Sequence, residues 1–209
     1  GCTFTAALTP VCADGFTAGD ADTCATGCVY AVHSGGDSLS LCDTCIVGRY
    51  AVEGTSDCSL CPGGRFLNVT GGTSESSCYT CAAGQASPSG AEQCGPCEVG
   101  KYIGGGGGSE CINCPAGKYA NTLGSDDPED CILCAAGKYN AEPGSAQCIV
   151  CTAGRYMPTA GADALEDCIG CPAGRYIDVS GGGSCIGCPT GRYIDVSGSD
   201  HQSDCIGCH

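Results

Sequence analysis

The sequence predicts a small disulfide-rich fold, mostly coil with short β-hairpins, arranged as an elongated repeat rod of about nine loops with almost no helix. The 209 residues include 24 cysteines, and most of these recur in evenly spaced pairs. Large apolar residues are scarce, because Leu, Ile, Val and Phe total 31, there is no Trp, and Gly alone contributes 36. Such a chain cannot build an ordinary core, so cross-links must restrict its unfolded ensemble.

The cysteine pairs define the domain organisation. Between residues 42 and 208 cysteines occur only as ten C-x-x-C pairs separated by nine loops, and the steps between second cysteines are 16, 20, 16, 17, 20, 17, 20, 17 and 20 residues. Residues 42–209 are therefore predicted to be hairpin repeats with a double unit of 36–37 residues. Residues 1–41 hold irregularly spaced cysteines and are expected to form a cap or preceding repeats.

Each loop opens with the same phrase. Glycine stands three residues after the second cysteine in all nine loops, and a basic and an aromatic residue follow it in eight. The 81–94 loop has Gln85-Ala86 in their place. Segments such as 175–181 alternate polar and apolar residues before meeting glycine, which predicts a short strand that runs into a turn.

Two disulfide registers are compatible with the spacing. In the first, the second cysteine of each pair bonds the first cysteine of the next pair and closes a hairpin, worth ~3 kcal/mol per loop. This register pairs Cys45–Cys58, Cys61–Cys78, Cys81–Cys94, Cys97–Cys111, Cys114–Cys131, Cys134–Cys148, Cys151–Cys168, Cys171–Cys185 and Cys188–Cys205, and upstream Cys28–Cys42 and Cys12–Cys24. It leaves Cys2 and Cys208 for inter-subunit disulfides. The competing register bonds each C-x-x-C to itself.

Other chemistries of cysteine and histidine are disfavoured. Repeated C-x-x-C pairs can bind zinc, but ten pairs would make five zinc sites in an already acidic chain. The segment from Cys94 to Cys97 matches the thioredoxin tetrapeptide, but no βαβ pattern surrounds it. His33, His201 and His209 form no triad-like order. We expect no catalytic residue, cofactor or metal site, and so no enzyme.

Charge and hydropathy restrict partners and location. A formal net charge of −15 opposes binding to nucleic acid or to anionic membrane surfaces. No stretch approaches the ~20 apolar residues of a membrane span, and an opening at Gly1 without a signal peptide is expected of a mature product or an excerpt. Dense disulfides require an oxidising compartment, so we expect an extracellular or cell-surface protein.

The repeated basic–aromatic pair allows two interpretations. Each cation could stack on a neighbouring ring within the fold, or the ladder of pairs could bind a sugar or an anionic polymer. An acidic residue precedes the next cysteine in five loops, where hairpin closure would bring it near the basic residue of the same loop; these are Asp57, Glu110, Asp130, Asp167 and Asp204. Separately, Asn68-Val69-Thr70 is an N-glycosylation sequon, so Asn68 is a candidate glycan site.

The phrases Cys-Pro-Ala-Gly-Arg-Tyr at 171–176 and Cys-Ile-Gly-Cys at 185–188 resemble the ephrin-receptor-like cysteine-rich repeat, itself similar to the first module of tumour-necrosis-factor-receptor repeats. The resemblance covers about residues 42–208. It implies an elongated, nearly coreless array of hairpins closed by disulfides at their bases. Such arrays are found in extracellular proteins of protists and algae, including proteins that look like components of tubular flagellar hairs.

Together these features predict a structural role: a subunit or segment of a filament, fibre or cell-surface coat, whose partners are copies of itself and attached glycans. The alternative is a receptor-type or adhesive ectodomain that binds a protein or glycan. A binder should carry apolar or aromatic loop tips, whereas these tips are mostly Gly, Ser, Asp and Thr. If successive hairpins point to opposite sides, the long loops after Cys97 would share one face.

Overall fold

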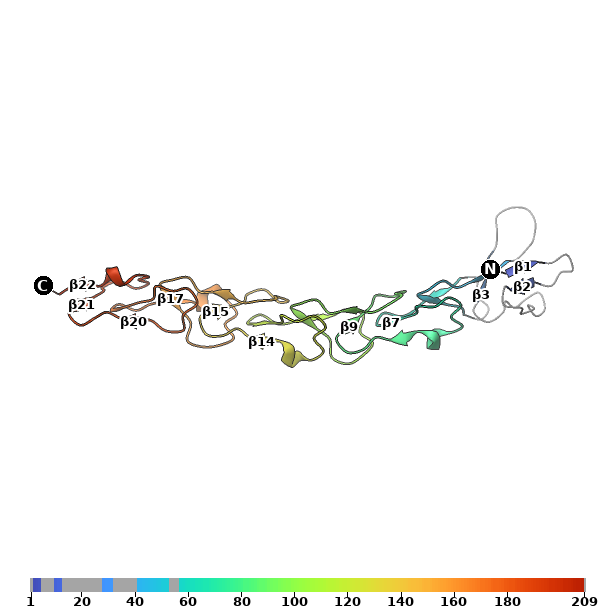
Figure 1. Ribbon diagram of the computed structural model, residues 1–209, viewed down its shortest axis with the longest axis horizontal. Helices are drawn as coiled ribbons and strands as arrows, with labels where there is room; N and C mark the ends of the chain where they lie inside the picture. The colour runs from blue at the N-terminus through green and yellow to red at the C-terminus, as the bar shows by residue number, and fades with distance from the viewer. Residues whose placement is uncertain (1, 5–9, 13–27, 32–40, 53–56, 209) are drawn as a thin grey trace. The chain divides into compact units, whose positions relative to one another are not determined.

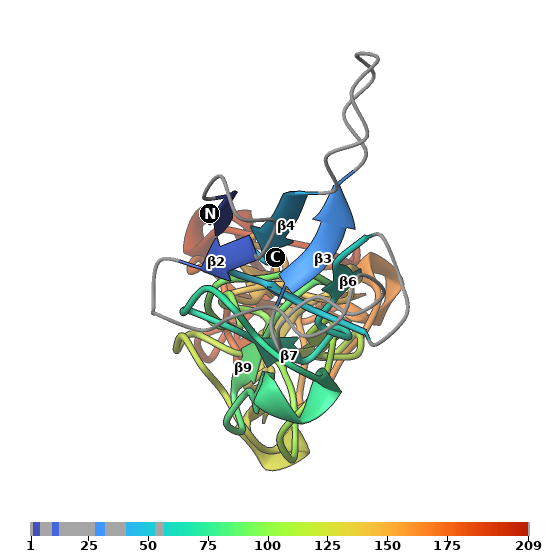
Figure 2. The same ribbon diagram turned by 90° about the vertical axis from the view of Figure 1, so that its right-hand side faces the viewer.

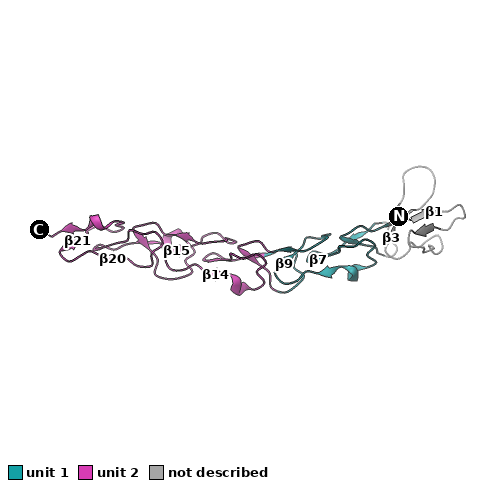
Figure 3. Cartoon of the chain, in the orientation of Figure 1, with its two compact units in different colours: residues 1–96, 105–111 teal, residues 97–104, 112–209 magenta. Residues whose placement is uncertain are grey.

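A computed structural model describes residues 2–4, 10–12, 28–31, 41–52 and 57–208. The chain divides into two compact units, the first formed by residues 1–96 and 105–111 and the second by residues 97–104 and 112–209 (Figure 3). Within the second unit the hairpins follow one another in a row. The predicted fold class is confirmed, since the described residues are mostly coil with two-stranded hairpins and single-turn helices.

The strands are short, and each pairs with one antiparallel partner (Figure 1). The first unit contains β1 (Cys2–Phe4), β2 (Pro10–Cys12), β3 (Cys28–Ala31), β4 (Leu41–Thr44), β5 (Arg49–Tyr50), β6 (Ser59–Leu60), β7 (Arg65–Phe66), β8 (Tyr79–Thr80), β9 (Gln85–Ala86) and β10 (Gly95–Pro96). The second contains β11 (Lys101–Tyr102), β12 (Ile112–Asn113), β13 (Lys118–Tyr119), β14 (Ile132–Leu133), β15 (Lys138–Tyr139), β16 (Ile149–Val150), β17 (Arg155–Tyr156), β18 (Ile169–Gly170), β19 (Arg175–Tyr176), β20 (Ile186–Gly187), β21 (Arg192–Tyr193) and β22 (Ile206–Gly207).

From β5 onward every hairpin has the same register. The basic–aromatic pair, or Gln85-Ala86, forms the first strand, and the two residues inside the next C-x-x-C form the second. In the 134–148 loop, for example, Lys138 lies opposite Val150 and Tyr139 opposite Ile149. The cysteine directly before the second strand is thereby brought close to the cysteine that stands four residues before the first strand, as Cys148 is to Cys134.

The disulfides follow the loop-closing register. They join Cys45–Cys58, Cys61–Cys78, Cys81–Cys94, Cys114–Cys131, Cys134–Cys148, Cys151–Cys168, Cys171–Cys185 and Cys188–Cys205, with Cα atoms 5.6–5.8 Å apart. Cys97 and Cys111 are also disulfide-bonded. Because Cys94 bonds Cys81, the thioredoxin-like tetrapeptide contains no internal disulfide. The side chains of Cys2, Cys12, Cys24, Cys28 and Cys42 lie outside the described residues.

One side chain per loop forms the core. The residue directly after the aromatic, here called the post-aromatic residue, is buried in all nine loops, with an exposed fraction of 0–6%. These residues are Ala51, Leu67, Ser87, Ile103, Ala120, Asn140, Met157, Ile177 and Ile194. Six of them pack against cysteines of their own loop's disulfide, so the core consists of small separate clusters rather than one continuous interior.

Backbone hydrogen bonds join each loop to the next. Between the 134–148 and 151–168 loops, Gly137 N–H donates to the carbonyl of Met157 at 2.9 Å, and Asn140 N–H to that of Ala162 at 3.1 Å. In return, Gly161 N–H donates to Cys134 at 2.7 Å. The same set recurs at other junctions of both units. Neighbouring loops are therefore joined by main-chain groups that need no particular side chain.

The long loops carry short 3-10 helices that the strand pattern did not predict. These are η1 (Glu75–Ser77), η2 (Pro128–Asp130), η3 (Leu165–Asp167) and η4 (Gln202–Asp204). Within the second unit, η2 and η4 lie on opposite sides (Figures 1 and 2). The expectation that the long loops share one face is therefore wrong, because successive hairpins of this unit do not simply alternate between two sides.

Candidate functional site

Four of the five arginines of the basic–aromatic phrase bind the backbone of their own hairpin. Arg155 Nη1 donates to the carbonyl of Cys168 at 2.8 Å, and Arg175 and Arg192 donate at 3.0 Å to Cys185 and Cys205. Arg49 does the same to Cys58 at 3.1 Å. Within the described part of the chain none of the cations stacks on a ring, so the first interpretation, stacking of each cation on a neighbouring ring, is wrong. The guanidinium instead closes the hairpin beside its disulfide.

The aromatic residue connects its loop to the next. The half-buried ring of Tyr139 packs against Cys151, Met157, Ala162 and Cys168 of the following loop. Tyr50 lies in the same way on the cluster of the 61–78 loop, and Tyr156 on that of the 171–185 loop. Burial of these rings across the junction explains why the position is aromatic, and it leaves little ring surface for a ligand.

The carboxylates expected beside the basic residues have another role. The carboxylate of Asp130 accepts from the N–H groups of Asp126 and Asp127 at 2.9 and 3.2 Å. Asp167 and Asp204 do the same at the starts of η3 and η4. Helix capping satisfies donors that a single turn cannot pair internally. For these three residues, pairing with the basic residue of the same loop was a wrong prediction.

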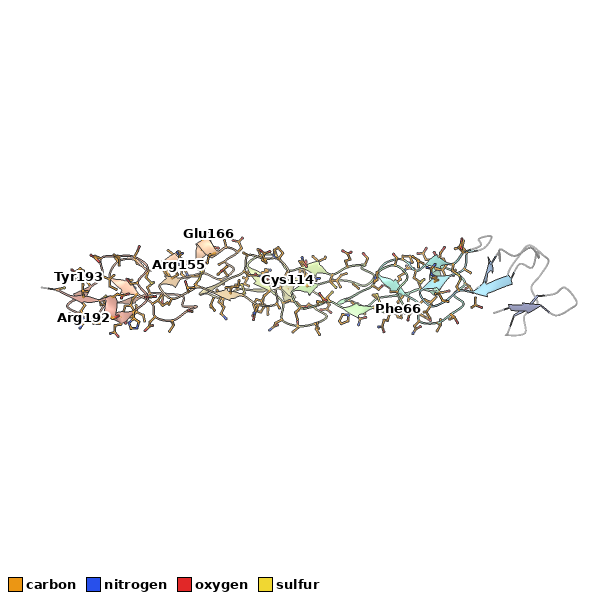
Figure 4. All side chains as sticks on the ribbon, turned by 90° about the horizontal axis from the view of Figure 1, so that it is seen from above. Phe66, Cys114, Arg155, Glu166, Arg192 and Tyr193 are labelled. Carbon is orange, nitrogen blue, oxygen red and sulfur yellow. A yellow bond between two sulfur atoms is a disulfide. The ribbon has the colours of Figure 1, made fainter. Side chains whose placement is uncertain are left out.

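Ion pairs lie elsewhere in the described residues. Arg65 Nη1 lies 3.5 Å from Glu75 Oε1, and Lys101 Nζ lies 3.4 Å from Glu98 Oε2. Both pairs are solvent-exposed, so each stabilises the fold by no more than ~1 kcal/mol. Figure 4 shows Glu166 projecting outward from the 151–168 loop. The acidic residues thus form a solvated surface rather than a concentrated site.

Two post-aromatic residues are polar, and each bonds the preceding loop. Asn140 Nδ2 donates to the carbonyl of Lys118 at 2.7 Å, and Ser87 Oγ donates to that of Arg65 at 3.0 Å. Both side chains are 1% exposed. The buried position could have been found in the sequence, because it always directly follows the aromatic residue. Ser87 and Asn140 hide it, because the other residues at this position are apolar.

The remaining candidate residues are exposed. Asn68 lies at the tip of the 61–78 loop, outside the packed junctions. Cys208 is a free, exposed thiol. The side chain of Cys2 lies outside the described residues, so the inter-subunit disulfides of Cys2 and Cys208 stay a prediction.

A row of exposed isoleucines is the main apolar feature of the second unit. Each follows the first cysteine of a pair, lies opposite the aromatic residue of its hairpin, and is 47–53% exposed. The six are Ile112, Ile132, Ile149, Ile169, Ile186 and Ile206. Apolar binding residues were expected at the loop tips, whereas these isoleucines stand in the second strand of each hairpin, directly after the first cysteine of a pair.

The family described as tyrosine-protein kinase ephrin type A/B receptor-like matches three segments, residues 84–131, 127–168 and 159–205. Together they span more than half of the chain, and each includes whole disulfide-closed loops. The chain belongs to this ephrin-receptor-like family. A comparison with curated proteins gives no match.

The ephrin-receptor-like repeat is a receptor-like cysteine-rich module and not an enzyme fold. Its many disulfides and its family point to an extracellular or cell-surface location. In the part of the chain that the structure describes, no helix is long and apolar enough to cross a bilayer. The cysteines of residues 45–205 are all in disulfides, so their sulfurs are not available as zinc thiolates.

Proposed function

We propose that this chain is an extracellular structural repeat protein, a subunit or segment of a filament, fibre or cell-surface coat. The observation that supports the proposal is the junction between loops. Each junction uses main-chain hydrogen bonds, one disulfide and one buried side chain, so loops can be added without a shared core. The free energy of folding then changes by a similar amount with each added repeat, so the array can reach the length that a spacer or fibre requires.

The exposed surface agrees with this role. Most residues at the described loop tips are small or polar, and the rings of Tyr50, Tyr139 and Tyr156 are engaged in the junctions. Exposed apolar side chains occur singly at some tips, as at Val69 and Leu123. Repeated, equivalent surfaces that associate without closing generate filaments. Copies of the same chain are therefore the proposed partners, with Cys2 and Cys208 as candidates for disulfides between them.

A receptor-type or adhesive ectodomain is the second candidate, and one observation favours it. The six half-exposed isoleucines of the second unit lie at equivalent positions, and exposed apolar side chains mark interaction surfaces. A protein partner could bind along this row. The same row could equally contact another copy of the chain, so the identity of the neighbour decides between the two functions.

Chemical cross-linking of intact extracellular material tests the proposal. A lysine linked to the same lysine, such as Lys118 to Lys118, can arise only between two copies, so such products identify self-association unambiguously. A structural subunit should give abundant self-links, together with Cys208-containing disulfides that a C208S variant lacks. Links predominantly to a different protein, with no self-links, would favour the receptor or adhesive function and reject the structural one.

A further inference from the structure

The tip of the 61–78 loop combines a sequence motif with the geometry that the motif requires. Asn68, Val69 and Thr70 form an Asn-x-Thr sequon, and all three residues are exposed. Val69 has an exposed fraction of 54%, whereas Leu67, directly before the sequon, is 1% exposed. The boundary between core and solvent therefore falls immediately before Asn68.

This boundary is a property of the repeat and not of one loop. The residue after the post-aromatic residue is exposed in all nine loops; these residues are Val52, Asn68, Pro88, Gly104, Asn121, Ala141, Pro158, Asp178 and Asp195. Extended backbone sends successive side chains to opposite sides, so burial of Leu67 directs Asn68 outward. Within the described part of the chain the Asn68 amide has no hydrogen-bond partner that a modification would remove.

The tip is also held at both ends. Leu67 N–H donates to the carbonyl of Ala91 at 3.1 Å, and Gly71 N–H donates to that of Cys45 at 2.7 Å. Gly71 has a φ of +77°, which a glycine adopts without strain. The sequon thus spans a short exposed turn between two anchored residues, and a bulky group on Asn68 would disturb neither anchor.

We propose that Asn68 carries an N-linked oligosaccharide when a eukaryotic cell secretes this chain. The donor is an oligosaccharide on a polyprenyl diphosphate. The Asn68 Nδ2 atom forms a bond to C1 of the first sugar, the bond from C1 to the diphosphate oxygen breaks, and the amide proton is released as the diphosphate leaves. The glycan covers Val69 and keeps this tip out of contacts between copies.

The chain offers a matched control at Asn121. Asn121 stands at the equivalent position of the 114–131 loop, is exposed, and precedes a glycine with φ +72° whose N–H donates to Cys97 at 2.8 Å. It lacks only the hydroxyl residue, because Leu123, 67% exposed, replaces threonine. L123T therefore creates a second sequon with the same local geometry.

The test is secretion of the full chain from a eukaryotic cell line that also secretes a known glycoprotein. Wild type should lose the mass of one glycan on treatment with peptide-N-glycosidase, with Asn68 converted to Asp in the peptide map. N68Q and T70A should show no glycan, and L123T should show two. Unmodified Asn68 in wild type, while the known glycoprotein is modified, would overturn the proposal whatever L123T shows. Glycan retained by both N68Q and T70A would also overturn it.

Discussion

At the scale of single residues, the glycine that opens the 134–148 loop has two separate reasons to be glycine. Gly137 has a φ of +80°, and a Cβ there would collide with the carbonyl oxygen of Gly181, two loops further on. The backbone conformation and the close approach both exclude other side chains. The sequence showed that a glycine was required, but not that the contact reaches beyond the adjacent loop.

These two reasons can be separated by experiment. G137A should destabilise its loop by ~1–2 kcal/mol for the positive φ and by a further ~1–3 kcal/mol for the collision. G174A is the matched control, because Gly174 has a φ of +81° but nothing described within 4 Å of its Cβ position. Local unfolding free energies from hydrogen exchange should show the larger loss in G137A. Equal losses in both variants would contradict the close-approach explanation.

The buried amide of Asn140 yields the second prediction. N140A removes the hydrogen bond that the buried Asn140 side chain makes to the part-buried Lys118 carbonyl, which should cost ~1–3 kcal/mol. N121A, at an exposed position, should change stability by less than ~0.5 kcal/mol. Denaturant titration of both variants measures the difference. No difference between them would show that the Asn140 contact does not hold the junction.

At the scale of the element, a hairpin with two residues per strand is not stable alone. Each one persists because a disulfide closes its base, an arginine or strand pair joins its arms, and a neighbouring ring covers its core residue. The stabilising contacts therefore lie at hairpin bases and junctions, not at the tips. Substitutions at the loop tips should therefore change the stability of the fold only a little.

Removal of one disulfide tests how local this arrangement is. The double variant C151A/C168A should lose ~3 kcal/mol of local stability, because the closed loop no longer restricts the unfolded chain. Hydrogen exchange should rise in the 151–168 loop and around Tyr139, which packs on this disulfide. The 61–78 loop, five loops earlier in the chain, should keep its protection. Loss of protection there as well would contradict stabilisation by nearby loops only.

Much of the structure of each hairpin could be predicted from the cysteine spacing and the repeated phrase. The short strands, the turns and the near absence of helix follow from alternation and glycine placement. The spacing alone left two disulfide registers open; the structure has the loop-closing one, because each C-x-x-C forms a strand whose flanking cysteines serve different hairpins. The 3-10 helices were not predicted, since a single turn has no periodicity to detect.

The candidate site was harder to predict, because its partners are backbone atoms. A repeated Arg-Tyr pair suggested contacts between side chains, yet Arg155 binds a carbonyl that no sequence pattern reveals. The capping role of Asp130 was missed for the same reason. Side-chain chemistry can be predicted from sequence, but a main-chain acceptor becomes apparent only once the register of the hairpin is known.

At the scale of the whole molecule, stability is the sum of many similar junctions rather than the product of one core. A net charge of −15 keeps the exposed surface soluble, and association with other copies must overcome the resulting repulsion. The half-exposed isoleucines and the Cys208 thiol are among the described groups that could supply the attraction. Assembly should accordingly be favoured by salt, which screens the charge.

Electron microscopy of native extracellular material, labelled with an antibody raised against this chain, tests the structural role most directly. The account predicts filaments, fibres or a coat layer that carry the label at regular intervals, with the intervals lost when reductant opens the disulfides. Label scattered singly over cell surfaces, or found only on monodisperse soluble molecules, would contradict a structural subunit and support a receptor-type or adhesive ectodomain.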